Sequence, residues 1–190
     1  CSPEAVPPPL VEQLKEGGRM IIPLGERYQQ VFYLFEKQNG KLVETRLIPT
    51  LFVPMTGASE EQREKQPDPL NPQIINGDFE DDANDDGLPD NWHYQRQTEF
   101  GQTGPPSSGR FLEISNEEPG RMAQALQGTA LDGRRIAAVR IELQVRYENV
   151  RPGPEPPDQP ALFVLFYDSI RRRIGEGVVG PWIGSRGWHR

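Results

Sequence analysis

Short apolar runs separated by turn-forming residues dominate the hydrophobic pattern of this chain. Apolar residues at positions 10, 11 and 14 have helical spacing, so we expect a helix over 10–16 that Gly17 ends. The run 19–24 is apolar after its first residue and is typical of a strand covered on both faces. Runs 30–36 and 41–48 read as two strands of a hairpin, because Asn39-Gly40 between them is the strongest two-residue turn signal.

This order predicts the end of an α/β sheet, closed by the run 51–55. About 65 residues of this kind cannot cover both faces of a sheet. We therefore expect the missing strands to lie upstream of Cys1.

The pattern changes in the second part of the chain, where short strands alternate with turn clusters. Strands are predicted at 110–114, 122–127, 137–147 and 161–167, and the strict alternation over 139–147 indicates one buried and one exposed face. Regular strands without a convincing helix favour a β-sandwich. The segment 175–180 fits G-x-G-x-x-G, but Pro181 follows where a helix should begin, so we interpret it as a β-turn cluster.

Composition places a boundary between these two parts. The segment 58–69 is charged, lacks aromatic residues and ends in two prolines, which predicts a linker over 58–73 and a boundary near residue 68. The net charge of −7 has the wrong sign for non-specific nucleic-acid binding. No apolar run approaches the roughly 20 residues of a membrane helix, so no membrane span is expected.

The single cysteine, Cys1, leaves two interpretations of the first residue open. A chain that begins with Cys fits a lipid-anchored bacterial lipoprotein, and it also fits a fragment of a longer reading frame. Because Gly187-Trp188-His189-Arg190 resembles a cut within a domain, we favour the fragment and expect the sandwich to be truncated there.

Several motifs in residues 1–57 occur in the order typical of one enzyme family. They are Ser2-Pro3, Gln13-Leu-Lys-Glu-Gly-Gly-Arg19, Ile22-Pro-Leu-Gly25 and Phe52-Val-Pro-Met-Thr56. The segment resembles the C-terminal third of protein-L-isoaspartate O-methyltransferases. Cys1 and Ser2 replace the alanines usual in that family, and Leu24 replaces a valine.

The resemblance implies a piece of a Rossmann-like sheet that uses S-adenosylmethionine. The family methylates the α-carboxylate of isoaspartyl residues in damaged proteins, and its cofactor loop and catalytic residues precede this segment. We therefore expect no catalytic or cofactor-binding residue here. What can remain is a substrate-binding wall of Cys1, Ser2, Pro3, Pro23, Leu24 and Gly25; the alternative is that these residues only shape turns.

An acidic run in the second part has the spacing of a calcium loop. Asp82, Asn84, Asp86 and Asp90, with the carbonyl of Leu88, alternate as oxygen ligands do in the first half of an EF-hand loop. The distal Glu of that loop is missing, and the alternative is a solvated acidic loop. We favour a structural Ca²⁺ because unpaired carboxylates at this density repel one another.

Asn76-Gly-Asp-Phe-Glu80, Gly87-Leu-Pro-Asp-Asn-Trp92 and Ser185-Arg-Gly-Trp188 resemble carbohydrate-binding modules with a jelly-roll or galactose-binding-like sandwich over 74–190. Trp92, Tyr94, Trp182 and Trp188 are candidates for stacking on a sugar, although core packing is favoured for Trp92 and Trp188. The expected function is thus a fragment of the methyltransferase with an appended sandwich, located in the cytoplasm. The alternative is a secreted or lipid-anchored, calcium-dependent carbohydrate-binding protein in the periplasm or outside the cell, without catalytic activity.

Overall fold

The computed structural model describes residues 2–25, 29–52, 68–104, 109–117, 120–153, 155 and 158–190. The chain divides into two compact units, Cys1–Val139 and Arg140–Arg190. Most of the predicted linker lies outside the described residues, so its placement and the domain boundary near residue 68 stay predictions. No helix in the described ranges has the length and apolar character needed to cross a membrane.

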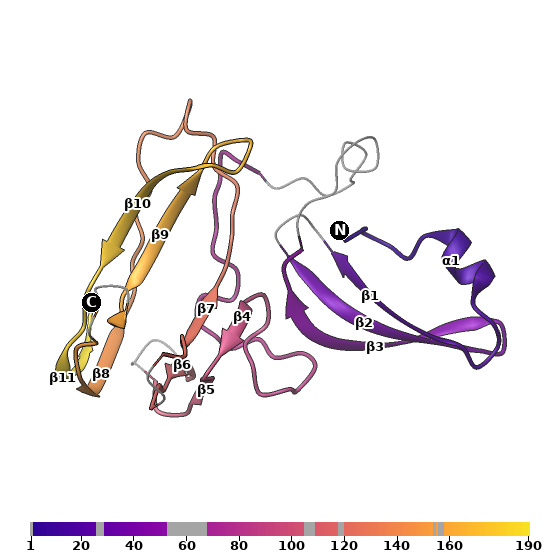
Figure 1. Ribbon diagram of the computed structural model, residues 1–190, viewed down its shortest axis with the longest axis horizontal. Helices are drawn as coiled ribbons and strands as arrows, with labels where there is room; N and C mark the ends of the chain where they lie inside the picture. The colour runs from indigo at the N-terminus through magenta and orange to yellow at the C-terminus, as the bar shows by residue number, and fades with distance from the viewer. Residues whose placement is uncertain are drawn as a thin grey trace. The chain divides into compact units, whose positions relative to one another are not determined.

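The first unit begins with helix α1 (Pro8–Gln13) and a three-stranded antiparallel meander, shown in Figure 1. Its strands are β1 (Arg19–Gly25), β2 (Gln30–Gln38) and β3 (Lys41–Thr50). The helix begins and ends earlier than predicted, because Pro8 is favourable in a first helical turn and Leu14 is already extended. Gly17 follows at φ +73°, a conformation that favours glycine.

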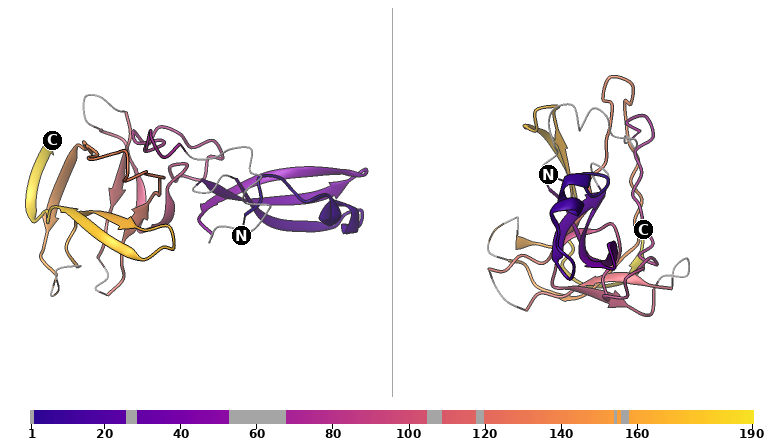
Figure 2. Two further views of the ribbon diagram at one scale, coloured as in Figure 1. Left: turned by 90° about the horizontal axis from the view of Figure 1, so that it is seen from above. Right: turned by 90° about the vertical axis from the view of Figure 1, so that its right-hand side faces the viewer.

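The Asn39-Gly40 hairpin is confirmed. Both residues have positive φ, and Gln38 pairs with Lys41 across a two-residue turn. The two further views in Figure 2 show α1 next to this hairpin end of the meander.

The meander is covered on the side of Phe35, which is 4% exposed and is the one large apolar side chain buried among the described residues. Ile21 lies on the opposite face of β1 and is 62% exposed. The expectation that run 19–24 is covered on both faces is therefore not met in this chain, where β1 is an edge strand and, among the described strands, pairs only with β2. A pair at this edge, Arg19 and Glu36, sits directly opposite in the register with Nε 2.8 Å from the carboxylate.

The strands described in the rest of the first unit are short, and most of its described residues lie in loops. Strand β4 (His93–Arg96) pairs with β7 (Gln124–Leu126), and β5 (Thr98–Gly101) pairs with β6 (Phe111–Ile114). The predicted strands at 110–114 and 122–127 are confirmed within a few residues. Strands β4 and β5 were not predicted, because their polar sequences have no apolar period.

The second unit contains two antiparallel strand pairs, β11 (Gly184–His189) with β8 (Val145–Val150), and β10 (Arg173–Val179) with β9 (Leu162–Tyr167). The predicted strand at 161–167 is confirmed, whereas the strand predicted over 137–147 begins only at Val145. The prediction of a turn cluster at 175–180 is wrong, because this segment lies mostly within β10. A Cβ at Gly175 or Gly177 would meet only ordinary van der Waals contacts, so neither position requires glycine.

Beyond residue 68 the described strands form four two-stranded sheets. The β-rich character expected of this part is confirmed. Its assembly into a sandwich stays a prediction.

Candidate functional site

The structure brings together the described residues of the predicted substrate wall. The Gly25 N–H donates a hydrogen bond of 3.0 Å to the carbonyl oxygen of Pro3, which places segment 2–3 beside the end of β1. Ser2 is fully buried there. Cys1 lies outside the described residues. Two segments about 20 positions apart in the sequence therefore meet at one end of the meander.

Gly25 cannot be replaced without moving the backbone. Its φ is +136°, and a Cβ built on it would lie 2.2 Å from the carbonyl oxygen of Gln29 and 3.0 Å from Cα of Gln30. The first distance is far below van der Waals contact, so any side chain here would separate β1 from β2. The glycine therefore sets the geometry of the wall.

Gln30 is a structural residue of this site that the sequence analysis missed. It is 1% exposed, and its side-chain oxygen accepts the N–H of Phe52 at 2.8 Å. The Phe52 ring packs edge-on against Phe32 with ring centroids 5.5 Å apart, and Phe32 sits opposite Pro23 in the register. The sequence feature that could have identified Gln30 is its place as a polar residue at the first position of an apolar strand.

The residue types in the wall limit the chemistry that it can perform. Ser2, Pro3, Pro23, Leu24 and Gly25 include no group that titrates near neutral pH. Such a surface can shape and orient a bound substrate but supplies no acid, base or charged ligand.

The opposite end of the meander is fixed by two charged side chains. Lys37 Nζ donates to the carbonyl oxygens of Val11 and Leu14 at 2.9 Å each, and these carbonyls lie at the C-terminal end of α1. The carboxylate of Glu16 accepts the N–H of Asn39 and, at 3.1 Å, that of Gly40. A cation at a helix C-terminus and an anion at turn amides are both favourable placements.

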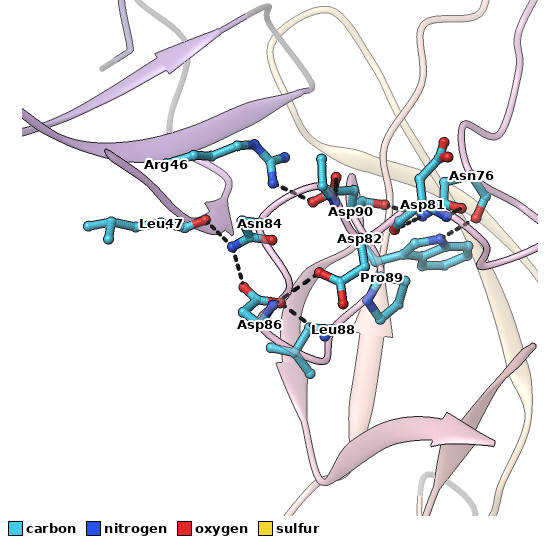
Figure 3. Close-up of polar contacts among 12 residues, drawn as sticks. Arg46, Leu47, Asn76, Asp81, Asp82, Asn84, Asp86, Leu88, Pro89 and Asp90 are labelled. Carbon is cyan, nitrogen blue, oxygen red and sulfur yellow. Dashed lines mark hydrogen bonds and ion pairs between the residues drawn. The ribbon is translucent and has the colours of Figure 1, made fainter. Parts of the chain in front are cut away.

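The predicted calcium ligands lie in one loop, drawn in Figure 3. Asp82 accepts the N–H groups of Asp86 and Gly87 at 3.1 and 3.2 Å. Asp86 accepts the N–H of Leu88 and the amide of Asn84, at 2.9 and 2.7 Å. The loop is therefore closed by hydrogen bonds from its own backbone to its carboxylates.

Asp90 ties this loop to the meander. It is 5% exposed, accepts the Ala83 N–H at 3.0 Å and forms an ion pair with Arg46 of β3 (Figure 3). The Asn84 amide donates to the carbonyl of Leu47 in the same strand at 2.9 Å.

Within the described ranges, no group of three or more His, Cys, Asp or Glu side chains is arranged to hold a metal ion. Because Asp90 already has a cationic partner, the geometry fits the hydrogen-bonded loop better than a filled coordination shell. The calcium site stays a prediction, and a Ca²⁺-dependent rise in melting temperature is its test.

The sugar-stacking candidates are divided between the two units. Trp92 is half-buried, donates from Nε1 to the carbonyl of Asn76 at 2.9 Å and lies 5.1 Å from the ring of Phe79. Tyr94 is 53% exposed, and its hydroxyl donates to the carbonyl of Leu51. In the second unit, Trp188 lies under the guanidinium of Arg146 and Trp182 is half-buried. Glycan binding by these residues stays a prediction.

Comparison with known proteins gives a family match in the first third of the chain. Residues 1–60 match the family model of protein-L-isoaspartate(D-aspartate) O-methyltransferase. This segment contains α1, the meander and the contact between Pro3 and Gly25.

Three of the matching curated relatives, all named protein-L-isoaspartate O-methyltransferase, show the extent of the similarity. The Hyperthermus butylicus protein is 47% identical over 53 residues, which are 27% of this chain and 22% of the relative. The Chromobacterium violaceum protein is 55% identical over 53 residues, covering 28% and 23%. The second such protein of a Polaromonas species is 50% identical over 54 residues, covering 27% and 26%. The chain thus spans about a quarter of the length of these relatives, and no solved structure matches it.

Among the described residues, the N-terminus of α1 does not fit S-adenosylmethionine, the cofactor implied by this family. A helix N-terminus binds anionic and polar ligand groups through free backbone N–H groups. The one described helix, α1, follows Pro7 and begins with Pro8 and Pro9, which have no N–H to offer. No chemical step is therefore assigned to residues of this chain.

Proposed function

We propose that residues 1–60 supply the substrate-side wall of a protein-L-isoaspartate O-methyltransferase. In the complete enzyme, a methyl group passes from S-adenosylmethionine to the α-carboxylate of an isoaspartyl residue in a damaged protein. The 190-residue chain is inactive by itself in this proposal, because it contributes shape and not a cofactor site. Residues 74–190 form an appended β-sandwich module, with a carbohydrate as its predicted partner.

The family match over residues 1–60 carries this proposal. The hydrogen bond from Gly25 to Pro3 supports it, because it gathers the candidate wall residues at one end of the meander. The described wall residues carry no group that titrates near neutral pH, which also fits a role in positioning a substrate for a reaction performed elsewhere in the enzyme.

A segment exchange tests the proposal. In the Chromobacterium violaceum relative, the segment that corresponds to residues 1–60 is replaced by these residues, and methylation of an isoaspartyl peptide is measured. We expect the chimera to keep activity. A folded chimera without activity, with folding checked by circular dichroism, contradicts the proposal.

Two variants of the chimera locate the wall. Gly25→Val should reduce kcat/KM on the order of 10²-fold, the cost of displacing a positioned group by about 1 Å. Val43→Thr is the matched control, because Val43 is 46% exposed on β3 and away from the wall. Equal activity of the two variants would remove the wall from the proposal.

A further inference from the structure

The chain contains two Asn-Gly pairs in very different surroundings. Asn39-Gly40 forms the turn between β2 and β3, and Asn76-Gly77 lies in the loop that precedes Asp90. In an Asn-Gly pair, the backbone nitrogen of glycine can attack the asparagine side chain with little steric hindrance, because glycine carries no Cβ. The same dipeptide thus appears twice, and only the fold distinguishes the two copies.

Asn76 is held by its whole side chain. Its Nδ2 donates to the carbonyl oxygens of Asp81 and Asp90 at 2.9 and 2.8 Å, and its Oδ1 accepts the Asp81 N–H at 3.0 Å. The residue is 8% exposed. Rotation of the amide toward the nitrogen of Gly77 would break three hydrogen bonds in a place with little water.

Asn39 has none of these restraints. It is exposed, and no hydrogen bond holds its side-chain amide among the described contacts. Gly40 has open space where a Cβ would stand. The amide can therefore turn toward the nitrogen of Gly40 without breaking a hydrogen bond of its own, and the attack breaks one bond, from the Gly40 N–H to the carboxylate of Glu16.

The two Asp-Gly pairs resemble Asn76 in this respect. The carboxylate of Asp86 accepts the Leu88 N–H, and that of Asp132 accepts the Arg134 N–H at 3.0 Å. Of the four Asn-Gly and Asp-Gly pairs, all within the described ranges, Asn39-Gly40 alone has an unrestrained side chain.

We propose that Asn39 is a site of spontaneous deamidation that produces an isoaspartyl linkage in the β2–β3 turn. The Gly40 nitrogen bonds to Cγ of Asn39 and loses its proton, and the Cγ–Nδ2 bond breaks so that ammonia leaves. Water then opens the resulting succinimide at either ring carbonyl. Opening at Cγ gives aspartate, and opening at the backbone carbonyl gives isoaspartate.

The modification acts on the contacts that define this end of the meander. The product places a new carboxylate beside that of Glu16, which accepts the N–H groups of Asn39 and Gly40. The isoaspartyl form also inserts one extra backbone atom into a two-residue turn, which cannot then keep Gln38 opposite Lys41. Deamidation therefore loosens the hairpin from the Glu16 loop.

Peptide mapping by mass spectrometry of the full chain, aged in mildly alkaline buffer, tests the proposal. Asn39 should lose its amide at least about tenfold faster than Asn76, since Asn76 reacts only after local opening. In denaturant the two rates should agree within about twofold, because only the fold separates the pairs. Similar rates in the folded chain, or strong protection of Asn39 relative to denaturant, would overturn it.

The Asn39→Asp variant separates the two products. It carries the new charge but keeps a normal backbone, and Asp-Gly is also a favoured turn pair. We expect amide exchange in β2 and β3 to increase more in the aged chain than in this variant. Equal exchange would contradict the predicted loss of register.

Discussion

Asp90 is a single residue on which two segments of the first unit depend. Its carboxylate accepts the Ala83 N–H and pairs with Arg46, while its backbone groups bond with Asp81 and with the amide of Asn76. The same carboxylate therefore closes the acidic loop and attaches it to β3. A buried anion is tolerated here because both its charge and its lone pairs have partners.

Replacing Asp90 by Ala should lower the free energy of unfolding of the first unit by about 2 kcal/mol, because Arg46 and the Ala83 N–H lose their acceptor. Urea unfolding of the full chain measures this change. Asp85→Asn is the matched control, since Asp85 is exposed in the same loop and its φ of +54° suits Asn equally well. Equal midpoints for both variants would show that the Asp90 contacts contribute nothing.

At the scale of the element, the junction of α1 with the hairpin rests on Lys37. Replacing it by Met keeps much of the apolar stem but leaves the carbonyls of Val11 and Leu14 without their donor. We expect the free energy of unfolding to fall by about 1 kcal/mol and amide exchange in α1 to become faster. Lys41→Met, at the exposed start of β3, is the control and should change exchange in α1 little. Unchanged exchange in Lys37→Met would contradict this role.

The turn between β9 and β10 provides a pH-dependent element in the second unit. Asp168 accepts the backbone N–H groups of Ile170 and Arg172 at 3.0 and 2.8 Å, and also the Arg172 Nε. The Arg172 backbone hydrogen bond is the main cause that lowers the pKa of Asp168 below its ordinary value of 3.8. The ionised carboxylate thus stabilises the turn at pH values above this ordinary pKa. The stabilisation is lost as the pH falls through the lowered pKa of the folded chain.

An NMR titration of the Asp168 carboxyl group should therefore give a pKa below 3.8. Asp168→Asn should accelerate amide exchange in β9 and β10 at neutral pH. Glu148→Gln, which changes an exposed side chain on β8, should not. An ordinary pKa together with unchanged exchange would contradict the proposed role of this turn.

The sequence predicted those elements in which local chemistry and apolar pattern agree. Asn39-Gly40 defined its hairpin, since both residues adopt positive φ, whereas Gly17 did not mark the end of α1, which stops at Gln13. Strand β4 was missed because a polar sequence becomes a strand only through its pairing partner. Gln30 and Asp90 were not predicted as structural anchors, because their partners are distant in sequence and a pattern does not reveal which donor meets which acceptor.

In the molecule as a whole, few of the large apolar side chains in the described ranges are buried. Phe35 is the one that is buried within the described ranges, whereas Ile21 in the first unit and Ile170 and Ile174 in the second are 62%, 69% and 68% exposed. Burial contributes only about 25 cal/mol per Å² of apolar surface, so each unit depends strongly on the polar contacts described above. This explains why single charged residues are expected to have measurable effects.

The full chain is predicted not to bind S-adenosylmethionine. Binding of S-adenosylmethionine requires preorganised donors for its polar groups, and the prolines at the start of α1 remove those of the one described helix. Calorimetric titration of the full chain with S-adenosylmethionine should therefore give no saturable heat, while the complete Chromobacterium violaceum relative, as positive control, should bind. Micromolar binding by the 190-residue chain would mean that it contains a cofactor site, and the assignment of residues 1–60 to the substrate side would then be wrong.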